Sequence, residues 1–112
     1  GFPQRAIYSA SKGAVHALTL AMAADHIREG IRINCVVPAT ADTPWVGRLL
    51  DQAQDAKAMK EALIARQPMG RLVTADEIAH AICYLASPLS SSTTGIGLNV
   101  DGGVGGLRIP PK

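Results

Sequence analysis

The chain has 112 residues, of which 47% are hydrophobic and 18% are charged. This balance excludes an intrinsically disordered chain and predicts one compact, core-forming unit without room for a second domain. Eleven lysine and arginine residues against nine aspartate and glutamate residues give a net charge of +2, with the two signs interspersed. We therefore expect no nucleic-acid partner. No apolar stretch reaches the ~18 residues that cross a bilayer, so no membrane partner is expected.

The cysteines and histidines show no metal or disulfide pattern. Cys35 and Cys83 lie in apolar runs without the spacing of a zinc site. They are expected to be buried thiols in a reducing compartment, which predicts a cytoplasmic protein. His16, His26 and His80 share no metal-ligand spacing, so no metal site is predicted.

The first third of the chain predicts a helix followed by a strand. Residues 6–28 contain no proline, are rich in alanine and leucine, and carry apolar side chains at near-helical spacing. This pattern predicts one long helix that ends at Gly30. The β-branched run 31–37 predicts a strand that is buried at its far end and stops at Pro38.

The middle of the chain predicts irregular structure and short helices. Residues 40–44 are expected to form a turn. Residues 45–66 are polar and rich in alanine, which indicates a mobile pair of short helices without strong caps. Pro68 and Gly70 then interrupt the helical pattern.

A further helix follows with a clear start signal. Thr74 and Glu77 form the Thr-x-x-Glu capping box, in which each side chain bonds the backbone N–H of the other residue. Arg71, just before the box, is expected to have a structural role by pairing with Asp76 or Glu77. A role in binding substrate is the less favoured interpretation.

The remaining segments complete an alternating pattern. Residues 90–94 are expected to be a loop, residues 97–100 a short strand and residues 101–112 a chain terminus. Helices and strands alternate along the chain, which predicts an α/β fold with parallel strands. Two strands form no stable sheet alone, so we expect the other strands in a preceding segment of a longer protein.

Tyr8 and Lys12 are the candidate proton-transfer residues. They are four residues apart in the predicted helix, so their side chains share a face. A positive charge ~5 Å from a phenol, at an effective dielectric of ~20, favours the phenolate by roughly 3 kcal/mol. Such a pair could exchange a proton near neutral pH. The pattern alone is weak, because exposed tyrosine–lysine pairs are common on helices.

Further motifs follow this pair in a fixed order. They are Ile33–Pro38, Thr43–Pro44, Pro68–Arg71, the capped helix, Thr94–Gly95 and Val100–Gly103. The ordered set resembles the C-terminal half of the short-chain dehydrogenase/reductase family over essentially the whole chain. The resemblance implies that residues 1–112 are the C-terminal portion of a single Rossmann-type domain with a doubly wound parallel sheet. The N-terminal cofactor-binding half would lie upstream.

The same resemblance implies an oxidoreductase that interconverts a secondary alcohol and a carbonyl with NAD or NADP. Tyr8 would be the general acid/base, and Lys12 would bind the nicotinamide ribose. The implied cofactor-binding residues are Tyr8, Lys12, Val37, Pro38, Ala39 and Thr43. The family usually has glycine where this chain has Ala39. The added methyl group costs on the order of 1 kcal/mol only if φ is positive, so cofactor binding is expected to survive.

In the resemblance, residues 45–66 correspond to the substrate-binding lid. Trp45, Arg48, Asp51 and Gln52 lie near its start and form a polar mixture that favours a hydroxylated substrate. We therefore expect a sugar or another small polyol as the carbonyl or alcohol substrate. Trp45 is equally compatible with the core of the lid.

The predicted first helix carries more small apolar residues than one sheet face can cover. They are Ala10, Ala14, Val15, Ala17, Leu18, Ala21 and Met22. An exposed remainder of this kind marks a partner surface, so we expect a homo-oligomer, either a dimer or a tetramer. The family resemblance points the same way.

Two other interpretations stay open. One is a catalytically silent fragment or scaffold that keeps the packing surfaces of the family. The other is an epimerase or dehydratase of the extended branch of the family, in which the same tyrosine and lysine occur. The short ending Val100–Gly103 resembles the shorter branch. The chain as given is expected to be inactive by itself, because it lacks the βαβ unit that holds the adenine and pyrophosphate.

Overall fold

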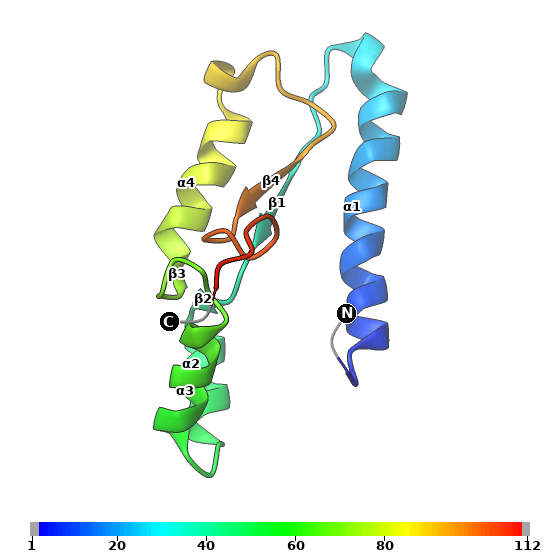
Figure 1. The fold of residues 1–112 in the computed structure, drawn as a ribbon. Helices are drawn as coiled ribbons and strands as arrows, with labels where there is room; N and C mark the ends of the chain where they lie inside the picture. The colour runs from blue at the N-terminus through cyan, green and yellow to red at the C-terminus, as the bar shows by residue number, and fades with distance from the viewer. Residues whose placement is uncertain (1–2, 111–112) are drawn as a thin grey trace. The chain divides into compact units, whose positions relative to one another are not determined.

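The computed structural model describes residues 3–110 (Figure 1). These residues divide into two compact units. The first unit contains residues 3–36 and 82–98, and the second contains residues 37–81 and 99–110. The buried apolar side chains are Ala23 and Leu85 in the first unit and Val46, Leu72 and Val73 in the second. Each unit therefore has buried apolar side chains of its own.

The first unit opens with helix α1 (Ala6–His26), which continues as a short 3₁₀ helix, η1 (Ile27–Glu29). Gly30 has φ +73° and ends the helical segment in a left-handed conformation. The predicted long helix and its end are thus confirmed. Thr19 and Ala23 are the buried residues of α1, and Ala23 lies close to the backbone at Gly95.

Strands β1 (Cys35–Pro38) and β4 (Gly97–Val100) pair with each other. The Gly95 amide donates to the Ile33 carbonyl and the Cys35 amide donates to the Ile96 carbonyl, so both segments advance in the same direction. This parallel pairing confirms the predicted α/β class and the strand at 97–100.

The strand predicted at 31–37 begins later than expected. The Ile33 amide donates to the Thr94 hydroxyl and the Asn34 side chain donates to the Thr93 carbonyl, so these residues bond to side chains and loop atoms. The expectation of burial at the far end is also wrong, because Val36 and Val37 are only half-buried.

Helix α4 (Ala75–Ala86) places its second half in the first unit. Leu85 is buried, whereas Cys83 is exposed, so the prediction of a buried thiol is wrong there. Two helical positions span ~200°, so Cys83 points away from the face that buries Leu85. Cys35 is half-buried. The 3₁₀ helix η2 (Pro88–Ser90) follows, at the start of the expected loop.

The second unit contains a pair of very short parallel strands, β2 (Ala41–Asp42) and β3 (Val73–Thr74). Ala41 is in register with Val73 and Asp42 with Thr74. The turn predicted at 40–44 is therefore wrong over the two residues of β2. Val73 is only 2% exposed, whereas Asp42 and Thr74 are exposed, so the ladder contributes Val73 to the core of the unit.

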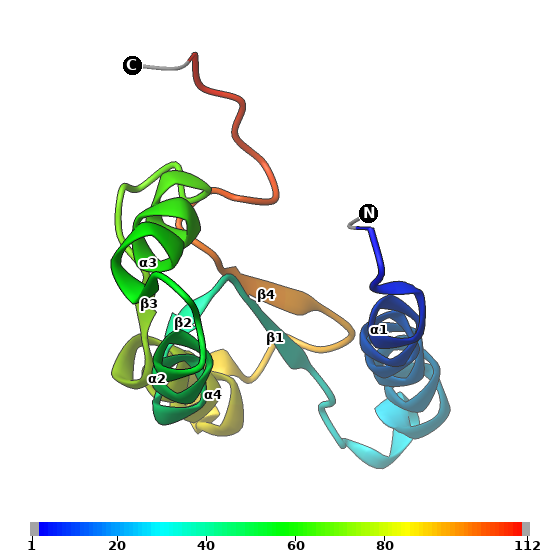
Figure 2. The same cartoon turned by 90° about the horizontal axis from the view of Figure 1, so that it is seen from below.

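Helices α2 (Pro44–Asp51) and α3 (Ala56–Ala65) confirm the predicted pair of short helices, which contact each other (Figure 2). The expectation of no strong caps is wrong. The Asp55 carboxylate accepts from the Ala58 amide at 3.0 Å and caps α3. No helix among residues 3–110 is both long enough and apolar enough to cross a membrane.

Candidate active site

Helix α1 brings Tyr8 and Lys12 together in its first two turns. The Lys12 Nζ atom lies 5.4 Å from the centroid of the Tyr8 ring. The Arg5 guanidinium lies 5.6 Å from the same centroid, so two cations contact one aromatic ring. The predicted Tyr8–Lys12 pair therefore exists as a local unit. Arg5 was not singled out from the sequence, although its i−3 spacing to Tyr8 was the available signal.

The polar ends of this pair are open. Tyr8 is 54% exposed and Lys12 is also exposed. Within the described residues, neither the Tyr8 hydroxyl nor the Lys12 ammonium makes a hydrogen bond. The Ser11 hydroxyl donates instead to the Tyr8 backbone carbonyl at 2.7 Å. Both functional groups are thus free to bond a ligand.

The predicted residues at the end of β1 belong to the second unit. Val37 and Ala39 are half-buried, Pro38 is exposed, and the Ala39 amide donates to the Val100 carbonyl at 3.3 Å. Among the described non-glycine residues only Gln4 has a positive φ. The Ala39 methyl group is therefore unstrained, and the replacement of the usual glycine has no backbone cost here.

Thr43 stands at the N-terminus of α2, where its hydroxyl accepts from the Val46 amide at 3.5 Å. Because the oxygen acts as the acceptor in this contact, the hydroxyl hydrogen stays available for donation. Trp45 and Arg48, the predicted lid residues, lie on α2 and are both exposed, Trp45 by 56%. Trp45 is thus not part of the core of the second unit.

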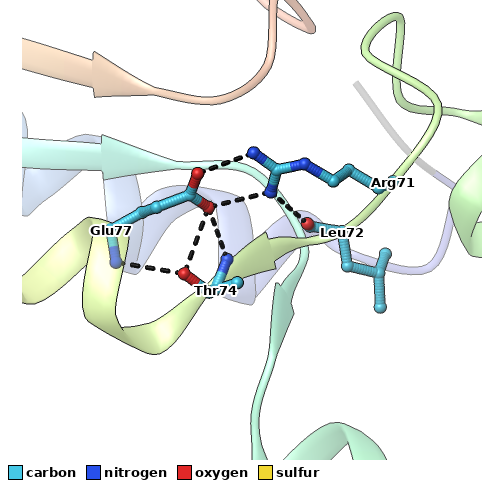
Figure 3. A network of polar contacts seen from close by, with 4 residues as sticks. All are labelled: Arg71, Leu72, Thr74 and Glu77. Carbon is cyan, nitrogen blue, oxygen red and sulfur yellow. Dashed lines mark hydrogen bonds and ion pairs between the residues drawn. The ribbon is translucent and has the colours of Figure 1, made fainter.

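Arg71, Thr74 and Glu77 form a closed polar network (Figure 3). Arg71 donates from Nη2 to Glu77 Oε1 at 2.7 Å and from Nη1 to Oε2 at 3.0 Å. The Thr74 amide donates to Glu77 Oε2 at 2.8 Å, and the Glu77 amide donates to the Thr74 hydroxyl at 3.1 Å. The predicted capping box and the predicted structural pairing of Arg71 are both confirmed.

The network has a clear electrostatic consequence. The hydrogen bond from Arg71, followed by that from the Thr74 amide, lowers the pKa of Glu77 from 4.5 to about 2. The same hydrogen bond raises the pKa of Arg71. Arg71 also donates to the Leu72 carbonyl, so its guanidinium ties the segment before β3 to the first turn of α4.

The described chain matches known proteins over most of its length. A family model described as enoyl-(acyl carrier protein) reductase matches residues 1–105. Dehydrogenase/reductase SDR family member 6 of Danio rerio is 44% identical over 103 residues, which cover 92% of this chain and 42% of that protein. The chain belongs to the short-chain dehydrogenase/reductase family.

Other dehydrogenases are also similar to this short-chain dehydrogenase/reductase chain. The 2-keto-3-deoxy-L-fuconate dehydrogenase of Xanthomonas campestris is 43% identical, over 92% of this chain and 35% of that protein. A solved short chain dehydrogenase family protein from Francisella tularensis superposes with a TM-score of 0.86 at 27% identity, over 96% of this chain and 46% of that one. These likenesses confirm the Rossmann-type α/β class. The chain spans about two-fifths of the length of the first of these relatives.

Proposed function

We propose that the complete protein containing this chain is an NAD(P)-dependent oxidoreductase that interconverts a secondary alcohol and a carbonyl. Membership of the short-chain dehydrogenase/reductase family supports the reaction class. The assignment to residues is carried by one observation, the contact of the Lys12 ammonium with the ring of Tyr8, both with free polar ends.

The residues present suit a dinucleotide. When bound, the nicotinamide supplies or accepts the hydride. The Tyr8 phenol gives a proton to the substrate oxygen or takes it, and the exposed Lys12 ammonium donates hydrogen bonds to ribose hydroxyls. For the rest of the cofactor, the Thr43 hydroxyl offers a donor.

For the substrate we propose a sugar or a small polyol. Arg48, Asp51 and Gln52 are polar and Trp45 presents an exposed ring, which together suit a hydroxylated molecule. One relative is named for 2-keto-3-deoxy-L-fuconate, which supports a substrate of this kind.

The test replaces the phenol oxygen alone. In the complete protein, Tyr8→Phe should lower kcat by about 10²–10⁴, because only the proton-transferring group is lost. Cofactor affinity, measured by NAD(P)H fluorescence, should stay almost unchanged. Tyr84→Phe, at the other tyrosine of the chain, is the matched control and should retain full turnover. A Tyr8→Phe enzyme with more than about a tenth of the normal rate would contradict the assignment.

Lys12 should behave differently from Tyr8. Lys12→Ala removes a cofactor contact as well as the charge beside the phenol ring, so both kcat and cofactor affinity should fall. Arg28→Ala, at an exposed cation of η1 outside the proposed lid, is the control and should leave both unchanged. If the unaltered complete protein neither binds cofactor nor turns over substrate, the protein is a catalytically silent scaffold. The 112-residue chain alone should show no NAD(P)H binding.

We further propose that the complete protein is a cytoplasmic homo-oligomer, a dimer or a tetramer. The free thiols Cys35 and Cys83 suit a reducing compartment. Within the described chain, Val15 and Leu18 of α1 are 54% and 57% exposed. Light scattering of the complete protein should therefore give a multiple of the monomer mass, and Ala17→Asp should reduce it. A monomer mass for the unaltered protein would refute the proposal.

A further inference from the structure

Arg5 directly precedes helix α1 and occupies a position that an arginine does not favour. It is the N-cap residue of α1 and makes no side-chain cap hydrogen bond. N-cap positions favour serine, threonine, aspartate and asparagine, whose side chains bond the free amides of the first turn. The positive end of the helix dipole also repels a cation there, and the first turn of α1 has no acidic residue to offset this. Arg5 therefore does not serve the stability of the helix.

The turn before Arg5 carries a further local cost. Gln4 has φ +58°, the only positive φ among the non-glycine residues that the structure describes. In this left-handed conformation the Cβ atom crowds the following carbonyl oxygen, which glycine alone avoids. Backbone strain of this kind collects at functional sites, where a side chain is needed in one place. Two unfavourable choices in consecutive residues therefore indicate a role for Arg5 beyond helix formation.

The Arg5 side chain lies against the ring of Tyr8. Its guanidinium carbon is 5.6 Å from the ring centroid, and within residues 3–110 the guanidinium forms no salt bridge. The Arg5 carbonyl accepts from the Ser9 amide at 2.7 Å, which fixes its backbone to the first turn. Side chains of a helix lean toward its N-terminus, so the Tyr8 ring lies over the turn that Arg5 begins. The start of α1 thus places the cation beside the ring.

A cation at this ring acts on the charge that develops in the proposed reaction. As the Tyr8 O–H bond breaks and its proton moves to the substrate oxygen, negative charge develops on the phenol. The guanidinium of Arg5 is always protonated, and it attracts this charge across the ring face. The Lys12 ammonium lies 5.4 Å from the same centroid, but it is also proposed to bond ribose hydroxyls. Arg5 is therefore the cation that can serve Tyr8 alone.

We propose that Arg5 is a positioning residue, which holds the Tyr8 ring and supplies a second positive charge beside the phenol as it loses its proton. The proposal rests on the proposed function, because Arg5 acts only through Tyr8. It requires no contact of Arg5 with substrate or cofactor. Replacement of Arg5 should therefore lower kcat and leave KM and cofactor affinity almost unchanged.

The first test follows carbonyl reduction by the complete protein through NAD(P)H absorbance, with the fastest substrate from a panel of keto sugars and other small ketones. Arg5→Gln should lower kcat about tenfold, because it removes the charge and the stacked group. Arg5→Lys keeps the charge and should stay within about threefold of the normal kcat. Arg28→Gln, at an exposed arginine of η1, is the control and should change nothing. A raised KM with a normal kcat would overturn the proposal, because Arg5 would then bind substrate directly.

A double-mutant cycle separates an action through Tyr8 from a direct one. In the Tyr8→Phe background no phenol loses a proton, so Arg5→Gln should change the residual kcat by less than about twofold. A direct contact with substrate would lower the rate equally in both backgrounds, and this result would overturn the proposal. If Tyr8→Phe itself keeps the normal rate, the proposed function fails and the role of Arg5 fails with it. If Tyr8→Phe loses the rate and Arg5→Gln does not, only the role of Arg5 fails.

Thermal unfolding of the complete protein distinguishes this role from support of the fold. Arg5→Ser introduces a favoured N-cap residue and removes a cation from the positive end of α1, so the melting temperature should stay the same or rise. The kcat of Arg5→Ser should nevertheless fall about tenfold, as in Arg5→Gln. If both variants melt at a lower temperature as they lose activity, Arg5 stabilises the fold and the proposal is overturned.

Discussion

Arg32 is expected to be a major source of stability in the first unit. Its guanidinium is part-buried and donates from Nη1 to the Leu85 carbonyl at 2.8 Å, the Ser90 hydroxyl at 3.0 Å and the Thr93 carbonyl at 3.1 Å. Its Nη2 donates to the Ser87 carbonyl at 3.1 Å. Arg32 thus ties the segment before β1 to the end of α4 and the loop beyond it, and it places a cation at a helix C-terminus.

The expected loss of unfolding free energy depends on which hydrogen bonds each acceptor still makes after Arg32 is replaced. The Leu85 carbonyl still accepts from the Ser90 hydroxyl, the Ser87 carbonyl from the Ser90 amide, and the Thr93 carbonyl from the Asn34 side chain. No carbonyl is left wholly unpaired, so the loss is smaller than four independent bonds to a charged group. We expect Arg32→Met, which keeps an apolar stem, to lower the free energy of unfolding by about 2–3 kcal/mol.

The measurement is urea unfolding of the complete protein, with hydrogen exchange as a local probe. Arg32→Lys keeps the charge but not the planar guanidinium group, so the free energy of unfolding should fall by about half as much as in Arg32→Met. Arg28→Met is the control and should change the free energy by less than about 0.5 kcal/mol. The reasoning is refuted if Arg32→Met is no worse than this control, or if Arg32→Lys equals the unaltered protein. Exchange of the Ser91 and Thr93 amides should also accelerate in Arg32→Met.

Three further outcomes are expected. The pKa of Glu77 is lowered from 4.5 to about 2 in the folded protein, so its carboxylate stabilises the fold above pH 4.5 and this contribution is lost as the pH falls toward 2. Glu77→Gln should therefore flatten the pH dependence of the urea unfolding midpoint between pH 4.5 and pH 2. Asp55→Ala removes the cap of α3 and should cost about 1 kcal/mol in thermal unfolding. Gly103→Ala should destabilise by more than about 1 kcal/mol in urea unfolding, because φ is +90° and the new Cβ would lie 2.6 Å from Leu107 Cδ1. Gly106→Ala, with nothing within 4 Å, should be nearly neutral.

The features that the sequence predicted well depend on residues close to each other along the chain. The end of the first helical segment needs only the left-handed φ that Gly30 supplies. The start of α4 needs only the reciprocal bonds of Thr74 and Glu77. The Tyr8–Lys12 pair belongs to the same group, because one helical turn suffices to bring the two side chains together.

The features that were missed depend on distant segments. Strands β2 and β3 have two residues each, too few to show an alternating pattern, and their pairing joins Ala41 to Val73. No local spacing links these two residues, so only the folded second unit reveals their pairing.

Helix α1 shows what composition alone leaves undetermined. A chain with 47% hydrophobic residues was expected to bury them together, yet Thr19 and Ala23 are the only buried residues of α1 within the described chain. The helix contains many alanines and leucines, whose intrinsic helix propensity favours it without extensive packing. Composition measures how much apolar surface a chain carries, whereas the fold decides what covers it. Val15 and Leu18 are exposed within the described chain, and our proposal that a second copy covers them is tested directly by the light-scattering measurement of the complete protein.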